Sequence, residues 1–312
     1  MKKLLLFSGV FALLIIISLY VISLQANGFT DPFYLRFTTP SQTSLIIGTS
    51  RAAQGLQPAE FNKILGREDM FNYAFTLGQS PFGQTYYESI KRKLKSDTKD
   101  GIFIVCIDPW SISSDLKNPN DSANFQEINL ALACKFVNLN PNIFYLLQYY
   151  NRPLVDLFYQ EPTNMLLHQD GWLEVNVAMG KGSQKNRLDS KIEEYETQNL
   201  PKFKYSEVRY RYLARIISYL SKHGHVYLVR LPVHEKMLEI DNKLMPDFNK
   251  KINTLCQKYR VNYLSFELNS NDCIYTDGNH LWKNSGRMVS QKVAEWVLQQ
   301  EKLYQKNQPN RP

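Results

Sequence analysis

The chain opens with an uncharged apolar run that is long enough to cross a membrane. Leu4–Leu24 contains no charged residue, and as a helix rising 1.5 Å per residue it is about 30 Å long, the hydrocarbon thickness of a bilayer. Two lysines precede it, and no basic residue follows until Arg36. The positive-inside tendency therefore places the N-terminus in the cytoplasm. We expect 1–26 to be a cytoplasmic stub and transmembrane signal anchor of a single-pass protein.

Cleavage of this segment as a signal peptide is the alternative, because secretory signals also begin with basic residues and an apolar run. A cleaved signal has a shorter apolar region that is followed by small residues. Here the run continues into Ser-Leu-Gln-Ala-Asn-Gly, where only Ala26 offers a weak cleavage site. An uncleaved anchor is the favoured interpretation, with 27–312 as one extracytoplasmic domain on the periplasmic or cell-surface side.

Beyond the anchor, short apolar stretches alternate with amphipathic ones. Stretches rich in β-branched and apolar residues predict buried strands over Ser44–Gly48, Met70–Phe75, Gly101–Ile107, His225–Leu231 and Val261–Phe266. Apolar residues at helical spacing predict helices over Gln84–Leu94, Val208–Leu220, Leu244–Lys258 and Asn284–Gln300. Such alternation implies an α/β fold in which helices cover both faces of a mostly parallel sheet.

The middle of the chain, at about 115–201, breaks this alternation. It is rich in Asn, Tyr and Leu, and it continues into the polar stretch Gly-Lys-Gly-Ser-Gln-Lys-Asn-Arg-Leu-Asp-Ser at 180–190. We expect a helical insertion followed by a polar loop. The sequence contains no internal repeat and no Pro- or Ser-rich linker, so a single domain with an insertion is the economical interpretation.

Composition removes several classes of protein. Of 312 residues, 44% are apolar and 21% charged, which excludes a disordered, collagen-like or coiled-coil chain. The 37 Lys and Arg exceed the 29 Asp and Glu by 8, but the excess is spread along the chain, so no nucleic-acid partner is expected. The four cysteines form no CxxC pair or zinc pattern, and we expect neither a metal nor a cofactor.

Two short motifs carry candidate chemistry. Ser50 follows the first predicted strand, at the sheet edge where ligands of open parallel sheets bind. Far along the chain, Asp277 precedes His280 by three residues. On a loop this spacing lets the carboxylate accept one imidazole N–H and leaves the other ring nitrogen free as a base that can activate a serine. The non-catalytic alternatives are a serine that caps a helix and a histidine that is fixed by a local aspartate.

These motifs resemble those of the SGNH (GDSL-like) hydrolase superfamily. Besides Gly48-Thr49-Ser50 and Asp277-x-x-His280, the stretch from Asn72 to Ser80, which includes Gly78, is similar to the second block of that superfamily. The resemblance implies a flavodoxin-like, three-layer α/β/α fold. It also implies a nucleophilic Ser50, a base at His280 oriented by Asp277, and an oxyanion hole formed by the N–H groups of Ser50 and Gly78.

The chain departs from the superfamily pattern in two blocks. Thr49 replaces an aspartate that is not the nucleophile. In the third block, Asp108 stands where the superfamily has an asparagine whose amide completes the oxyanion hole. An ionised carboxylate only accepts hydrogen bonds, so Arg51 or Asn72 is a candidate substitute donor. His234, which follows a strand end, is a candidate border of the site, although an ordinary helix-start residue is the simpler interpretation.

Two functional hypotheses follow. The first is a serine esterase or O-acyltransferase that acts on acyl esters of a cell-envelope polysaccharide, because the variant pattern is similar to that of membrane-anchored envelope acyl-transfer proteins. The second is a non-catalytic protein that keeps the fold in order to bind envelope glycan or to partner a membrane acyltransferase. Both hypotheses place the domain beside the lipid bilayer, to which the N-terminal helix attaches it.

Overall fold

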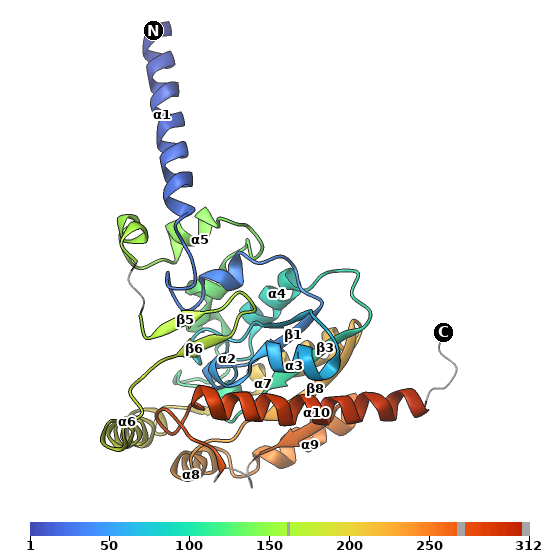
Figure 1. Ribbon diagram of the computed structural model, residues 1–312. Coiled ribbons are helices and arrows are strands. Elements are labelled where there is room, and N and C mark those ends of the chain that lie inside the picture. Colours follow the sequence, from blue (N-terminus) through green and yellow to red (C-terminus); the bar gives the residue numbers. More distant parts are fainter. Residues whose placement is uncertain (161–162, 267–271, 308–312) are drawn as a thin grey trace.

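The computed structural model describes residues 1–160, 163–266 and 272–307. Five strands form the central sheet (Figure 1), all paired in parallel in the order β2-β1-β3-β8-β9. Their bounds are β1 Ser44–Ile47, β2 Met70–Asn72, β3 Gly101–Cys106, β8 Gly224–Arg230 and β9 Asn262–Ser265. Each of the five predicted apolar stretches overlaps one of these strands, so the prediction of a parallel α/β sheet is confirmed.

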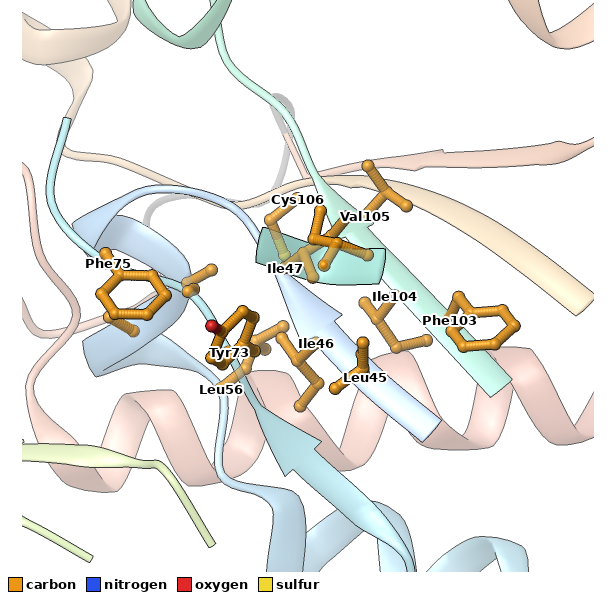
Figure 2. Packing of buried hydrophobic residues seen from close by; sticks show 14 of the residues in the cluster. Leu45, Ile46, Ile47, Leu56, Tyr73, Phe75, Phe103, Ile104, Val105 and Cys106 are labelled. Atoms are coloured by element: carbon orange, nitrogen blue, oxygen red, sulfur yellow. The ribbon is translucent and has the colours of Figure 1, made fainter. Parts of the chain in front are cut away.

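The inner strands are apolar on both faces because helices cover both. Every residue of β1 and β3 is buried. In Figure 2 the side chains of Leu45, Ile46 and Ile47 lie beside those of Phe103, Ile104 and Val105 from the neighbouring strand. Continuous apolar runs of this kind are typical of strands that are buried on both sides.

The helices pack in two groups, one on each face of the sheet. One group joins α2 (Ser50–Gly55), α3 (Pro58–Leu65) and α10 (Lys283–Asn307), and the other joins α4 (Gln84–Lys93), α7 (Glu207–Leu220) and α9 (Phe248–Tyr259). Right-handed crossovers place the helix after β1 and the helix after β2 on opposite faces, since the chain reverses direction across the sheet at β2. Helix α8 (Glu235–Leu244) follows β8.

Within the described ranges, one helix is long and apolar enough to cross a membrane. It is α1, Lys2–Ser23, and it projects away from the domain (Figure 1). Its side chains are almost all exposed, which excludes a buried core helix. The remainder of the chain folds below its C-terminal end.

The insertion differs from the prediction. Beside the expected helix α5 (Ile143–Gln148), it holds an antiparallel hairpin of β5 (Met165–Leu167) and β6 (Leu173–Val175). The stretch at 180–190 belongs to helix α6, Lys181–Glu193, so the prediction of a polar loop is wrong. Helix α6 has few apolar residues, and tertiary hydrogen bonds from Gln184 and Arg187 hold it in place.

Short elements complete the chain. A second small antiparallel pair joins β4 (Ser113–Ser114) to β7 (Lys204–Tyr205). One π-helical turn, η7 (Glu194–Asn199), continues α6. The 3₁₀-helices are η1 Tyr34–Phe37, η2 Trp110–Ile112, η3 Ser122–Asn124, η4 Gln126–Asn129, η5 Ala131–Ala133 and η6 Leu154–Phe158.

Candidate active site

Ser50 lies just beyond the carboxyl end of strand β1, where it begins helix α2. The turn that delivers it depends on Gly48, whose φ of +151° is unfavourable for residues with a side chain. A Cβ atom at this position would lie 2.8 Å from Cβ of Cys106 on the adjacent strand. Because Ser50 is the first residue of its helix, its backbone N–H has no intrahelical acceptor and can bind an incoming oxygen.

The structure brings Ser50, His280 and Asp277 together although Ser50 and His280 are 230 positions apart in the sequence. Nε2 of His280 lies 2.8 Å from Oγ of Ser50. Nδ1 of the same ring lies 2.8 Å from Oδ2 of Asp277. We call these three side chains the triad. With Nδ1 protonated toward the carboxylate, Nε2 is an acceptor for the serine proton.

The loop that carries the base is fixed by Asp277 itself. Its Oδ1 accepts the backbone N–H groups of Asn279, at 3.0 Å, and His280, at 2.9 Å. Burial opposes ionisation of this carboxyl, but the attraction of His280 and the hydrogen bonds from its ring and backbone outweigh burial and hold the pKa well below its usual range. Asp277 therefore stays ionised and supports a positive charge on the imidazole.

Arg51 connects the serine turn to this loop. Its Nε donates to Oδ1 of Asn279 at 2.9 Å, and its two terminal nitrogens form a bidentate pair with Asp241 of α8 at 2.7 and 2.9 Å. Arg51 and Asp241 are both buried. Nδ2 of Asn279 in turn lies 3.2 Å from Nε2 of His280. The guanidinium thus holds the network around the triad, and its bonds to Asp241 and Asn279 aim it away from the role of a free oxyanion donor.

Asp108 is buried behind the serine turn. Its Oδ2 accepts from the Thr49 hydroxyl at 3.1 Å, and its Oδ1 accepts from the backbone N–H of Ser111 at 2.8 Å. The pKa of this carboxyl is raised, mainly by burial and also by the negative charge of Asp241. The positive charge of Arg51 opposes this rise. The side chain therefore ties the segment after β3 to Thr49, the residue before Ser50.

The structure leaves two other candidates outside the triad. Both amide N–H groups of Asn72 are used, at 2.9 Å by the carbonyl of Ala52 and at 2.8 Å by that of Leu56. This buried side chain fixes α2 to β2 and has no donor left for an oxyanion, so it is not a substitute donor. Gly78 lies in the turn after β2, beside the side chain of Gln126, and within the described ranges no backbone hydrogen bond joins it to the triad.

His234 begins helix α8 and borders the base loop through its backbone. Its N–H donates to the carbonyl of Gly278 at 2.9 Å, while its ring Nδ1 accepts from the backbone N–H of Lys236 at 3.3 Å. The ring also lines a hollow of about 450 Å³ between α6 and the loop. His234 is therefore both the ordinary helix-start residue and a border of the site.

Helix α6 supports the loop that carries Asp277 and His280, a role that no sequence motif indicated. Gln184 donates to the carbonyl of Tyr275, and Arg187 donates to that of Thr276, each at 2.8 Å. A second hollow, of about 330 Å³, lies between α6 and Asp277. The stretch lacks an apolar stripe, so periodicity could not reveal the helix. The sequence analysis also did not identify Asp241 or Trp110, because no motif connects them to the triad. Nε1 of Trp110 donates to Oδ1 of Asp241 at 2.7 Å.

Comparison with known proteins adds no family assignment. No protein-family model matches the chain, and no curated protein matches it. In the part of the chain that the structure describes, no group of three or more His, Cys, Asp or Glu side chains could hold a metal ion. All four cysteines are free thiols in that same part.

Proposed function

We propose that the protein is a membrane-anchored serine esterase or O-acyltransferase of the SGNH type. The observation that carries the proposal is the contact of Nε2 of His280 with Oγ of Ser50 at 2.8 Å, on a ring whose other nitrogen faces Asp277. A nucleophile, a base and a group that orients the base are the three parts that acyl transfer through serine requires. The strand order β2-β1-β3-β8-β9 is that of a flavodoxin-like sheet, which supports the same class.

The reaction proceeds in two steps, formation of an acyl-serine and its breakdown. Oγ of Ser50 attacks the ester carbonyl while Nε2 of His280 takes its proton, and the imidazolium returns that proton to the departing alcohol. Water or a sugar hydroxyl then attacks the acyl-serine and gives its proton to Nε2. The bond between the acyl carbon and Oγ breaks, the imidazolium returns the proton to Oγ, and the acid or the new ester leaves. The N–H of Ser50 stabilises the oxyanion in both steps, and Gly78 is the proposed second donor.

The substrate class is an acyl ester of an extracytoplasmic polysaccharide. Helix α1, with lysines on its N-terminal side only, supports an extracytoplasmic domain beside the bilayer. An envelope glycan, with a membrane acyltransferase as acyl donor, suits that location. The sequence resemblance favours the same chemistry.

A non-catalytic, glycan-binding or acyltransferase-partner role is the second candidate, and Asp108 is the observation that favours it. The carboxylate replaces an amide donor, and removing one oxyanion donor typically lowers the rate by about 10²–10³. A chain that keeps the fold for binding can tolerate such a loss.

Labelling of the full-length protein by a fluorophosphonate probe tests the choice. Ser50 is expected to be modified, and modification is expected to vanish in Ser50→Ala and in His280→Ala. The matched control is His225→Ala, because His225 lies at the amino end of β8, away from the triad, where it pairs with Glu301. Equal labelling of all four proteins, or of none, would reject the enzyme in favour of the binding role.

A further inference from the structure

The exposed apolar side chains of the domain are concentrated in one region. Outside residues 1–24, eleven large apolar side chains of the described ranges are exposed, and nine of these lie between residues 128 and 165. The surface of a soluble protein rarely contains such a concentration of apolar side chains unless it binds a protein, a ligand or a membrane. Five of the nine lie on α5 or η6 or at the end of η6, and a sixth, Phe136, stacks on Phe144 of α5. We call these six the foot: Phe136, Phe144, Leu147, Val155, Phe158 and Tyr159.

The foot lies beside the helix that is long and apolar enough to cross the membrane. Both α5 and η6 contact α1, and Figure 1 shows α5 directly below the base of α1. The exposed side chains of the foot therefore lie at the level where α1 leaves the lipid. Amphipathic segments at this level bury their apolar side chains in the boundary between headgroups and acyl chains.

Hydrogen bonds hold the foot to the segment that follows α1. Oδ2 of Asp31 accepts from the hydroxyl of Tyr145 in α5 at 2.9 Å. Nδ2 of Asn142, which caps α5, donates to the carbonyl of Phe37 at 3.0 Å. The hydroxyl of Tyr34 accepts the backbone N–H of Asn142 at 3.2 Å. The foot therefore keeps its position relative to the end of α1.

The composition of the foot suits a bilayer surface. Between residues 128 and 159 the only charged residues in the sequence are Lys135, Arg152 and Asp156. The side chains of Lys135 and Arg152 are exposed. Four of the six foot residues are phenylalanine or tyrosine, and tyrosine is among the aromatic residues that are enriched at membrane–water interfaces. Two exposed cations are compatible with anionic lipid headgroups.

We infer that the foot is a second membrane-binding surface, which inserts into the leaflet from which α1 emerges and seats the domain on the bilayer. The occupant is lipid, since the surface continues that of the membrane helix. The inference is independent of the proposed ester chemistry. It predicts that the foot contacts acyl chains even when the protein is alone in the bilayer.

Fluorescence quenching in nanodiscs tests this contact with the full-length protein. Phe158→Trp and Phe144→Trp add a reporter to the foot, and Leu303→Trp adds one to an equally exposed apolar position near the end of α10. Each protein is compared with the parent chain in nanodiscs of ordinary and of acyl-brominated phosphatidylcholine, which quenches only on close contact. We expect the added fluorescence to be lost at Phe158 and Phe144 and kept at Leu303.

The decisive variant adds a charge to the foot. Val155→Asp in the Phe158→Trp protein is expected to restore part of the lost fluorescence, since a charge opposes insertion while an exposed position tolerates it. If both reporters in the foot remain as bright as that at Leu303, the lipid contact does not exist. That result would assign the surface to a protein partner absent from the nanodisc, and it would leave the labelling of Ser50 unaffected.

Discussion

Replacing Asp277 by Asn tests how the base is oriented. In the wild-type protein Oδ1 accepts two backbone N–H groups of the loop, and Oδ2 faces Nδ1 of His280 at 2.8 Å. An asparagine keeps the first oxygen and replaces the second by an N–H donor. The ring then has to present an unprotonated Nδ1 to this donor, so its proton moves to Nε2, which faces Ser50. A protonated Nε2 cannot accept the serine proton.

The expected loss is large in rate and small in stability. The same exchange of tautomer in a serine-protease triad lowers kcat by about 10⁴-fold, and we expect a loss of rate of this size for Asp277→Asn. The free energy of unfolding is expected to change by about 1 kcal/mol, because the two backbone hydrogen bonds to Oδ1 are kept. Asp277→Ala removes those bonds too, so it is expected to lose stability as well as rate.

Hydrolysis of p-nitrophenyl acetate by the full-length protein in detergent measures the rate, and urea unfolding measures the stability. Wild type, Asp277→Asn, Asp277→Ala and Ser50→Ala are compared at one pH. The reasoning fails if Asp277→Asn turns over within tenfold of the wild type while Ser50→Ala is inactive. In that case the ring is oriented by another group, for which Asn279 at 3.2 Å from Nε2 is the nearest candidate.

Three further predictions concern positions around the triad and the core. Asp108→Asn supplies the amide donor that the resemblance expects, so ester hydrolysis should rise by about 10²–10³; an unchanged rate would remove position 108 from the oxyanion hole. Gly48→Ala forces a Cβ to within 2.8 Å of Cys106, and calorimetry should show a lower Tm, equivalent to about 1–3 kcal/mol. Burial lowers the pKa of Lys93 to about 7, so between pH 7 and 9 the unfolded chain binds more protons than the folded one. The free energy of unfolding should then rise by roughly 1 kcal/mol per pH unit in urea titrations, and a rise of equal size in Lys93→Met would contradict this.

The central sheet could be predicted because its strands are buried on both faces. A continuous run such as Gly101–Cys106 has one stable location in a globular protein, which is the middle of a covered sheet. The insertion could not be predicted in the same way. Helix α6 has almost no buried side chain, and its hydrogen bonds to the carbonyls of Tyr275 and Thr276 join segments about 90 residues apart. Local periodicity contains no information about such contacts.

The candidate site divides along the same line. Ser50, Asp277 and His280 were predictable because each lies in a short motif at a strand end or a helix start. Only part of the role of Arg51 could be predicted from the sequence. The sequence marked it as a neighbour of the serine, but its partner Asp241 lies in another helix and is recognised only when the fold brings the two charges to 2.7 Å.

The position of Arg51 has a consequence for how the triad responds to heating. This residue is the direct chain neighbour of Ser50, and it holds Asn279, the direct chain neighbour of His280. The two halves of the triad are therefore joined through one buried cation, which is itself neutralised by Asp241. The turn at Ser50 and the loop that carries Asp277 and His280 should therefore become disordered together. On heating, the triad should come apart in one cooperative step with the core, without a folded but misaligned intermediate.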